Sequence, residues 1–232
     1  MHRRSHPGLS AARERFHGWS LTVLLAVQIF LIFIQGPMME LGLPISSTEA
    51  ATLFVVLVAV VIVVEPSPGP AIAVLTALLF DAASVVLVHL PHVTVSTYWL
   101  NAAGSVLAIA GLSWMVIRMV FSPGPIDRLR VVGSIVMYLN IALLFTALYR
   151  LVWALQPGSF TGIPRDFTLQ RASGDLMYFS MTTLTTVGYG DIAPLHPLAR
   201  SLSNLEGLVG QLFPAIILAR VMGLYTGDRP RK

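Results

Sequence analysis

Long apolar stretches separated by short polar or proline-rich breaks dominate this chain of 232 residues. A helix needs about 20 mostly apolar residues to cross the roughly 30 Å hydrocarbon core of a bilayer. Six stretches reach this length, at about 19–38, 48–65, 70–89, 98–121, 130–154 and 198–225. Several of the breaks contain proline, which cannot continue the hydrogen-bond ladder of a helix. The pattern predicts an all-α membrane protein with six transmembrane helices.

The composition supports a lipid environment. Hydrophobic residues make up 55% of the chain and charged residues 11%, with a mean hydropathy of +0.76. Soluble domains carry about 25% charged residues, so most of this surface must face lipid. The absence of cysteine excludes disulfides and thiolate metal sites.

The basic residues predict how the helices are oriented. With six spans, both termini lie on one side of the membrane, together with Arg3, Arg4, Arg13, Arg15, Arg118, Arg128, Arg130, Arg220, Arg229, Arg231 and Lys232. The other side holds only Arg150, Arg165, Arg171 and Arg200. By the positive-inside rule, we expect a multi-pass protein of the plasma membrane with cytoplasmic tails at 1–18 and 227–232.

The segment between the last two spans departs from this simple pattern. Residues 157–172 are polar and predict an outer loop, and residues 173–184 predict a short helix capped by Ser173, with Asp175 near its positive end. This helix is too short to cross the bilayer, so it must enter and turn back. Irregular backbone at membrane depth survives only inside protein or along a water-filled cavity. Residues 185–190 are therefore expected to line a cavity.

The residues after this re-entrant helix suit the binding of a dehydrated cation. Moving an ion from water into a low-dielectric medium costs on the order of 20 kcal/mol, so protein oxygens must replace the lost water. Backbone carbonyls can do so if some residues adopt positive φ, which glycine does readily. Gly188 and Gly190 occupy alternate positions, and Thr186 adds a hydroxyl. One strand cannot surround an ion, so the arrangement requires an oligomer.

This region resembles the filter signature of the tetrameric potassium-channel family through the run Thr185-Thr186-Val187-Gly188-Tyr189-Gly190-Asp191. The resemblance covers about residues 130–226 and implies a pore domain at 126–226 with an outer helix, pore helix, filter and inner helix. It also implies a homotetramer that binds K⁺ through the Thr186 hydroxyl and the carbonyls of Thr186, Val187, Gly188 and Tyr189, with Gly190 at the outer mouth. Apart from permeant K⁺, no cofactor is expected.

Five further residues are expected to support the filter. Many members of that family have two tryptophans in the pore helix, and several have a glutamate behind the filter. The matching residues in this chain are Tyr178, Phe179 and Thr182, of which Phe179 cannot donate a hydrogen bond. Thr185 and Asp191 flank the filter at its two ends.

The last span contains the candidates for gating. Gly207 and Gly210 suit either close helix packing or, for Gly210, the hinge common in the family, and Pro214 is expected to mark a bend. Leu218 and Met222 follow at a spacing of four, as an apolar stripe that either closes the pore or contacts lipid or a neighbouring helix.

Glu206 is an ionisable residue within a predicted span, which makes it a functional candidate. Its carboxylate could tune the field at the filter from behind, pair with a basic residue such as Arg200, or make a structural hydrogen bond. We favour the structural hydrogen bond.

Residues 19–125 predict a four-helix domain that resembles a voltage sensor without its arginine array. The fourth span carries only Arg118, near one end. Moving one charge through the membrane field yields about 2.3 kcal/mol per 100 mV, so steep gating needs several charges. Weak or absent voltage dependence is therefore expected. Glu65 and Asp81 are left without an assigned role, either as remnants of countercharges or, for Asp81, as a hydrogen-bonding group between helices.

The sequence thus favours a subunit of a K⁺-selective channel that contacts membrane lipid and no nucleic acid. The alternatives are a poorly selective cation channel and a non-conducting regulatory subunit. The intact filter argues against the regulatory subunit. An enzyme is not expected. The histidines near the spans, His89, His92 and His196, all lie at the predicted outer surface, and Asp81 has no partner aspartate at membrane depth.

Overall fold

The computed structural model describes residues 22–30, 32–34, 128–167 and 169–227, with isolated helical positions between 104 and 118. The predicted spans 48–65 and 70–89, with Glu65 and Asp81, lie outside the described residues. The same holds for both predicted tails apart from Gly227, and for most of span 98–121.

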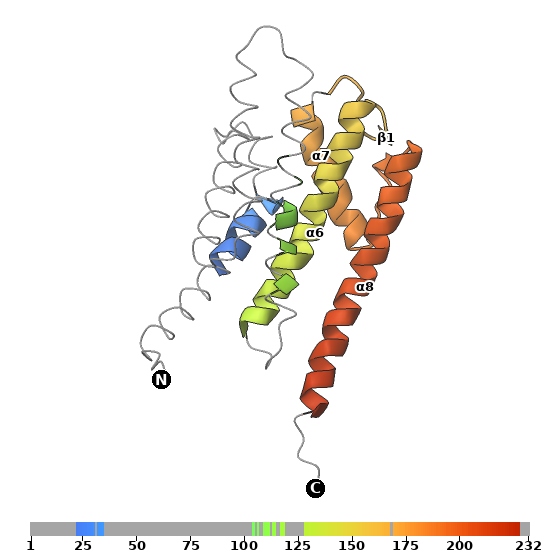
Figure 1. The fold of residues 1–232 in the computed structure, drawn as a ribbon. Coiled ribbons are helices and arrows are strands. Elements are labelled where there is room, and N and C mark those ends of the chain that lie inside the picture. Colours follow the sequence, from blue (N-terminus) through green and yellow to red (C-terminus); the bar gives the residue numbers. More distant parts are fainter. Residues whose placement is uncertain are drawn as a thin grey trace, which may run out of the picture.

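Three helices and a two-stranded sheet make up the C-terminal part of the chain (Figure 1). In chain order they are α6 (Arg128–Leu155), β1 (Phe160–Thr161), α7 (Leu169–Leu184), β2 (Ala193–Pro194) and α8 (Pro197–Gly227). Segments within α6 and α8, Arg130–Leu155 and Pro197–Arg220, are long and apolar enough to cross a membrane. They coincide with the fifth and sixth predicted spans.

The short helix between these two spans begins earlier than predicted. At 16 residues, α7 is about 24 Å long at 1.5 Å per residue, which is less than the hydrocarbon core. It begins at Leu169, so Ser173 lies inside the helix and the prediction that Ser173 caps it is wrong. The residues from Leu169 to Ala172 contain no helix breaker and are good helix formers, which explains the longer helix.

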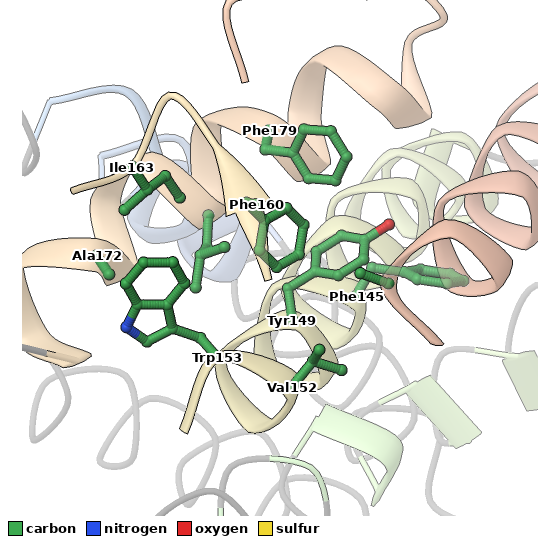
Figure 2. Close-up of a cluster of buried hydrophobic side chains, with 10 residues drawn as sticks. Phe145, Tyr149, Val152, Trp153, Phe160, Ile163, Ala172 and Phe179 are labelled. Carbon is green, nitrogen blue, oxygen red and sulfur yellow. The ribbon is translucent and has the colours of Figure 1, made fainter. Parts of the chain in front are cut away.

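A cluster of buried aromatic and aliphatic side chains holds α7 against α6 (Figure 2). Its three central rings pack edge to face, with centroids 5.5 Å apart for Tyr149 and Phe160, 5.1 Å for Tyr149 and Phe179, and 5.3 Å for Phe160 and Phe179. Such pairs contribute about 0.5–1.5 kcal/mol each beyond the burial of their area. The cluster also includes Ala199 of α8, so it lies where the three helices meet near β1.

The helix that forms most of the first predicted span contacts α6 through a buried amide pair. Gln28 Nε2 donates to Asn140 Oδ1 at 2.5 Å, and both side chains are fully buried. Leu24, one turn earlier, is also fully buried. The predicted first span therefore packs on the outer helix of the predicted pore domain.

Helix α8 approaches the end of α7 so closely that only glycine fits at position 210. A Cβ atom on Gly210 would overlap the carbonyl oxygen of Leu184 and lie 2.8 Å from its carbonyl carbon. The obstacle is backbone, which cannot rotate away as a flexible side chain could. A Cβ atom on Gly207, one turn earlier, would meet none of the described residues within 4 Å.

Replacing these two glycines by alanine should therefore have opposite effects on stability. Gly210→Ala should lower the free energy of unfolding by about 1–3 kcal/mol, as overpacking does. Gly207→Ala should be neutral or stabilise by up to about 1 kcal/mol through its better helix propensity. Denaturant unfolding in detergent micelles measures both. Equal effects of the two variants would contradict the close contact with Leu184.

Candidate selectivity filter

The last turn of α7 ends in a Schellman motif, a hydrogen-bonded cap that reverses the chain direction. The amide of Thr186 donates to the carbonyl of Thr183 (3.0 Å), and the amide of Val187 donates to the carbonyl of Thr182 (2.9 Å). Thr186 has a φ of 59°, at the position where such caps usually carry glycine. The motif directs the loop from residue 187 onward back along the helix.

Each of the last four carbonyls of α7 accepts a hydrogen bond. Besides the two bonds of the cap, the carbonyl of Thr182 accepts the amide of Gly188 at 3.2 Å, and that of Met181 accepts the amide and hydroxyl of Thr185. The hydroxyl of Tyr138 on α6 donates to the carbonyl of Leu184 at 3.1 Å. A helix end normally leaves these four groups without intrahelical partners. Here the loop itself and α6 provide the hydrogen-bond donors for all four carbonyls.

Positive φ angles recur at every second residue of the loop. Thr186, Gly188 and Gly190 have φ values of 59°, 52° and 83°, and the residues between them do not share this conformation. In an ordinary extended chain, successive carbonyls point to opposite sides. A regular alternation in the sign of φ brings successive carbonyls to the same side, as expected from the two glycines.

The positive φ of Thr186 was not anticipated from the sequence. A left-handed conformation costs an L-residue about 1–2 kcal/mol, because Cβ approaches the following carbonyl oxygen, and a β-branched residue rarely adopts it. One signal in the sequence could have predicted it: the two-residue spacing of Gly188 and Gly190 leads, two residues earlier, to Thr186.

The loop at residues 186–190, the candidate filter, is almost uncovered by the part of the chain that the structure describes. The side chains of Val187 and Tyr189 are 53% and 72% exposed, and a Cβ on Gly188 or Gly190 would meet nothing within 4 Å. Among the described residues, the one aromatic ring that stacks on Tyr189 is that of Tyr178 on α7, nearly parallel at 6.3 Å between centroids. The Tyr178 hydroxyl in turn hydrogen-bonds the side chain of Asp191.

The other sequence-selected supporting residues lie in different places. Phe179 packs into the aromatic cluster between α6 and α7, where it is 5% exposed. Thr182 contributes its backbone carbonyl to the loop, while its hydroxyl donates to the carbonyl of Phe179 at 3.0 Å. The structure therefore brings Tyr178, Tyr189 and Asp191 together and leaves Phe179 in the core.

Glu206 of α8 connects all three helices. Its side chain is fully buried and accepts hydrogen bonds from the hydroxyls of Tyr149 on α6 (2.6 Å) and Ser180 on α7 (2.5 Å). Arg200 is the basic residue that was considered as a partner of Glu206, and its guanidinium donates to the carbonyl of Pro194. This geometry favours the structural hydrogen bond among the three interpretations of Glu206, because a buried polar group is tolerated when its oxygens are hydrogen-bonded.

The candidate gate residues lie further along α8. The helix continues through Pro214 to Gly227. Proline has no amide hydrogen, so the carbonyl of Gly210 loses its usual partner four residues later. Leu218 and Met222 are 63% and 60% exposed. The hinge at Gly210 and the apolar gate stay predictions.

The family model described as "Ion channel" (Ion_trans_2) matches residues 136–226, the stretch that contains most of α6 and α8 and the loop between them. Protein LctB of Bacillus caldotenax is 34% identical over 87 residues, which are 37% of this chain and 64% of that protein. Inward rectifier potassium channel Kirbac3.1 of Paramagnetospirillum magnetotacticum is 33% identical over 85 residues, 37% of this chain and 24% of that protein.

LctB of Geobacillus stearothermophilus is similar at 33% identity over 37% of this chain and 63% of its own length. The chain thus spans between about a quarter and just under two thirds of the length of these relatives. No solved structure matches the chain. The family match, the relatives and the apolar helices together support a pore-loop ion channel in a membrane.

The strain at Thr186 can be tested by stability measurements without K⁺. Thr186→Gly should leave the free energy of unfolding unchanged or raise it, because glycine adopts this φ freely. Gly188→Ala should lower it by about 1–2 kcal/mol at a similar φ. Denaturant unfolding in micelles gives both values, and a loss of more than about 1 kcal/mol for Thr186→Gly would contradict the strain.

The partners of Glu206 can be identified by double-mutant cycles. Tyr149→Phe and Glu206→Leu should be non-additive by about 0.5–3 kcal/mol in unfolding free energy, as residues in direct contact are. Arg200→Gln should be additive with Glu206→Leu, because Arg200 donates to Pro194 instead. Additivity in the first cycle, or coupling in the second alone, would contradict the observed network.

Proposed function

We propose that this chain is one subunit of a homotetrameric, K⁺-selective channel whose filter is formed by residues 186–190. The observation that carries the proposal is the alternation of positive φ at Thr186, Gly188 and Gly190 in an exposed loop at the carboxyl end of α7. Such a loop turns a row of carbonyl oxygens toward one side, which suits the replacement of the water around a cation.

The proposed ligands follow from this conformation. The carbonyls of Thr186, Val187, Gly188 and Tyr189 provide successive oxygen rings, the Thr186 hydroxyl provides the innermost one, and Gly190 lies at the outer mouth. The carboxyl end of α7 points its partial negative charge toward the same region. The protein supplies oxygens and geometry, and K⁺ passes as the permeant ion.

Four copies around a central axis explain the exposure of the filter. Val187 and Tyr189 have little cover within one chain. A closed ring of identical subunits covers them without leaving an unpaired interface. The exposed apolar stripe of α8 at Leu205, Leu208 and Leu212 is then available to neighbouring subunits and lipid.

Selectivity for K⁺ is favoured over a poorly selective cation pore by the support of Tyr189. Tyr178 stacks on Tyr189 and hydrogen-bonds Asp191, so it provides a hydrogen-bond donor where Phe179 has none. One relative is named an inward rectifier potassium channel, which agrees with this choice. A non-conducting regulatory subunit would have no use for the strained Thr186.

The proposed placement is a multi-pass subunit in the plasma membrane. Both termini lie in the cytoplasm and the filter opens toward the outside, according to the distribution of arginine. The region 19–125 forms a domain like a voltage sensor without the arginine array, so gating depends weakly or not at all on voltage.

The test is the reversal potential of the purified protein in a planar bilayer, with K⁺ on one side and Na⁺ on the other. A value near the K⁺ equilibrium potential is expected. It should be lost with Gly188→Ala, which forces a side chain into a φ of 52°, and kept with Gly174→Ala, a helical glycine with open space around it. A reversal potential near zero with clear current would overturn K⁺ selectivity, and the absence of current would overturn conduction by this chain alone.

A further inference from the structure

The loop after α6 pairs in antiparallel fashion with the segment that follows the proposed filter. We call residues 159–162 the loop strap and residues 191–196 the exit segment. In the antiparallel β1–β2 sheet, Phe160 lies opposite Pro194 and Thr161 lies opposite Ala193. The carbonyl of Ser159 accepts the amides of Leu195 (2.8 Å) and His196 (3.1 Å). The strap is therefore attached along most of the exit segment.

The hydroxyl of Thr161 adds a side-chain bond to this attachment. Its oxygen accepts the amide hydrogen of Ala193 and its own hydrogen points to the carbonyl of Ala193, both at 3.2 Å. Valine has the same shape as threonine without the hydroxyl, whereas serine keeps the hydroxyl. Substitutions by valine and serine at position 161 therefore distinguish the effect of the hydrogen bond from the effect of side-chain packing.

Gly162 brings the strap into contact with the residue that follows the filter. It has a φ of 80°, and a Cβ there would overlap the carbonyl oxygen of Asp191 and lie 3.2 Å from the Cα of Ile192. Asp191 directly follows Gly190. Through the hydrogen bond of Asp191 to Tyr178 and the stack of Tyr178 on Tyr189, the contact reaches the filter ring itself.

The other end of the strap is fixed to the body of the protein. The Ser159 hydroxyl donates to the carbonyl of Gln156, just past the end of α6, and Ser159 is 2% exposed. Phe160, also 2% exposed, lies in the aromatic cluster with Tyr149 and Phe179 (Figure 2). The strap thus transmits the position of α6 to the outer end of the filter within one chain.

We propose that the loop strap is a positioning element that holds the outer end of the filter in its ion-binding conformation, with Gly162 and Thr161 as its key residues. This inference rests on the proposed function of the filter. Bound K⁺ and the strap then stabilise the same backbone conformation. A ligand that binds only one conformation stabilises it by mass action, so a weaker strap must be compensated by a higher K⁺ concentration.

The experiment measures K⁺ flux into liposomes as a function of symmetric K⁺ concentration. Thr161→Val should raise the concentration for half-maximal flux by about two- to tenfold, the effect of one lost hydrogen bond, and Thr161→Ser should leave it near that of the wild type. Gly162→Ala should raise it further. Gly158→Ala is the matched control, because Gly158 also has positive φ (89°) but the atoms nearest to a Cβ there belong to the side chain of Arg165 and not to backbone.

Hydrogen exchange of the amides at 187–196 is the second readout, and it requires no conduction. In the Thr161→Val and Gly162→Ala variants, these amides should exchange faster than in the wild type at low K⁺ and regain protection at high K⁺. In the Thr161→Ser and Gly158→Ala variants, their exchange rates should match those of the wild type. Equal exchange in Thr161→Val and Thr161→Ser, or no recovery with K⁺, would overturn the strap. Absence of flux in the wild type would overturn the proposed function instead. The difference in hydrogen exchange between Thr161→Val and Thr161→Ser would still test whether the strap positions the segment.

Discussion

The conformation of the filter loop depends on how α7 ends. A helix leaves its last four carbonyls without intrahelical partners, and a membrane interior offers little water to satisfy them. Here the carbonyls from Met181 to Leu184 accept bonds from the loop that follows and from Tyr138 of α6. The need to satisfy these carbonyls therefore draws the loop back against the helix. The hydrogen-bonded cap therefore sets the direction in which the proposed filter begins.

Thr186 is the residue at which local preference and proposed function disagree. The cap and the alternating backbone both place it at positive φ, where glycine would be less strained. Strained residues persist when the surroundings over-determine them, and they concentrate at functional sites. The proposed role of its hydroxyl as an ion ligand gives a reason for threonine at this position, and the two bonds of the cap supply the constraint that keeps it there.

The three helices are held together near the filter by two contacts of different chemistry. One is the edge-to-face packing of Tyr149, Phe160 and Phe179, which joins α6, the loop strap and α7. The other is the buried carboxyl group of Glu206, which accepts hydrogen bonds from hydroxyl groups of α6 and α7. Tyr149 takes part in both, through its ring and its hydroxyl. The same side chain therefore links the apolar packing to the polar network behind the proposed filter.

Local pattern determined much of this protein in advance. The lengths of the apolar stretches predicted the two long helices, because crossing lipid imposes a length, and the alternating glycines predicted the backbone of Gly188 and Gly190 because only glycine adopts positive φ without strain. The start of α7 was misplaced, since a possible cap at Ser173 competes with helix formers before it. A capping rule read from a single residue cannot decide that competition.

The tertiary structure alone decided which distant groups meet. Glu206 bonds with residues 57 and 26 positions earlier, and no sequence spacing distinguishes these partners from Arg200 nearby. Only glycine fits at position 210 because the carbonyl of Leu184 lies against it, and the carbonyl of Asp191 imposes the same restriction at position 162. Periodicity and propensity encode hydrogen bonding and burial along one segment. Contacts between segments depend on how the helices pack, which only the folded chain establishes.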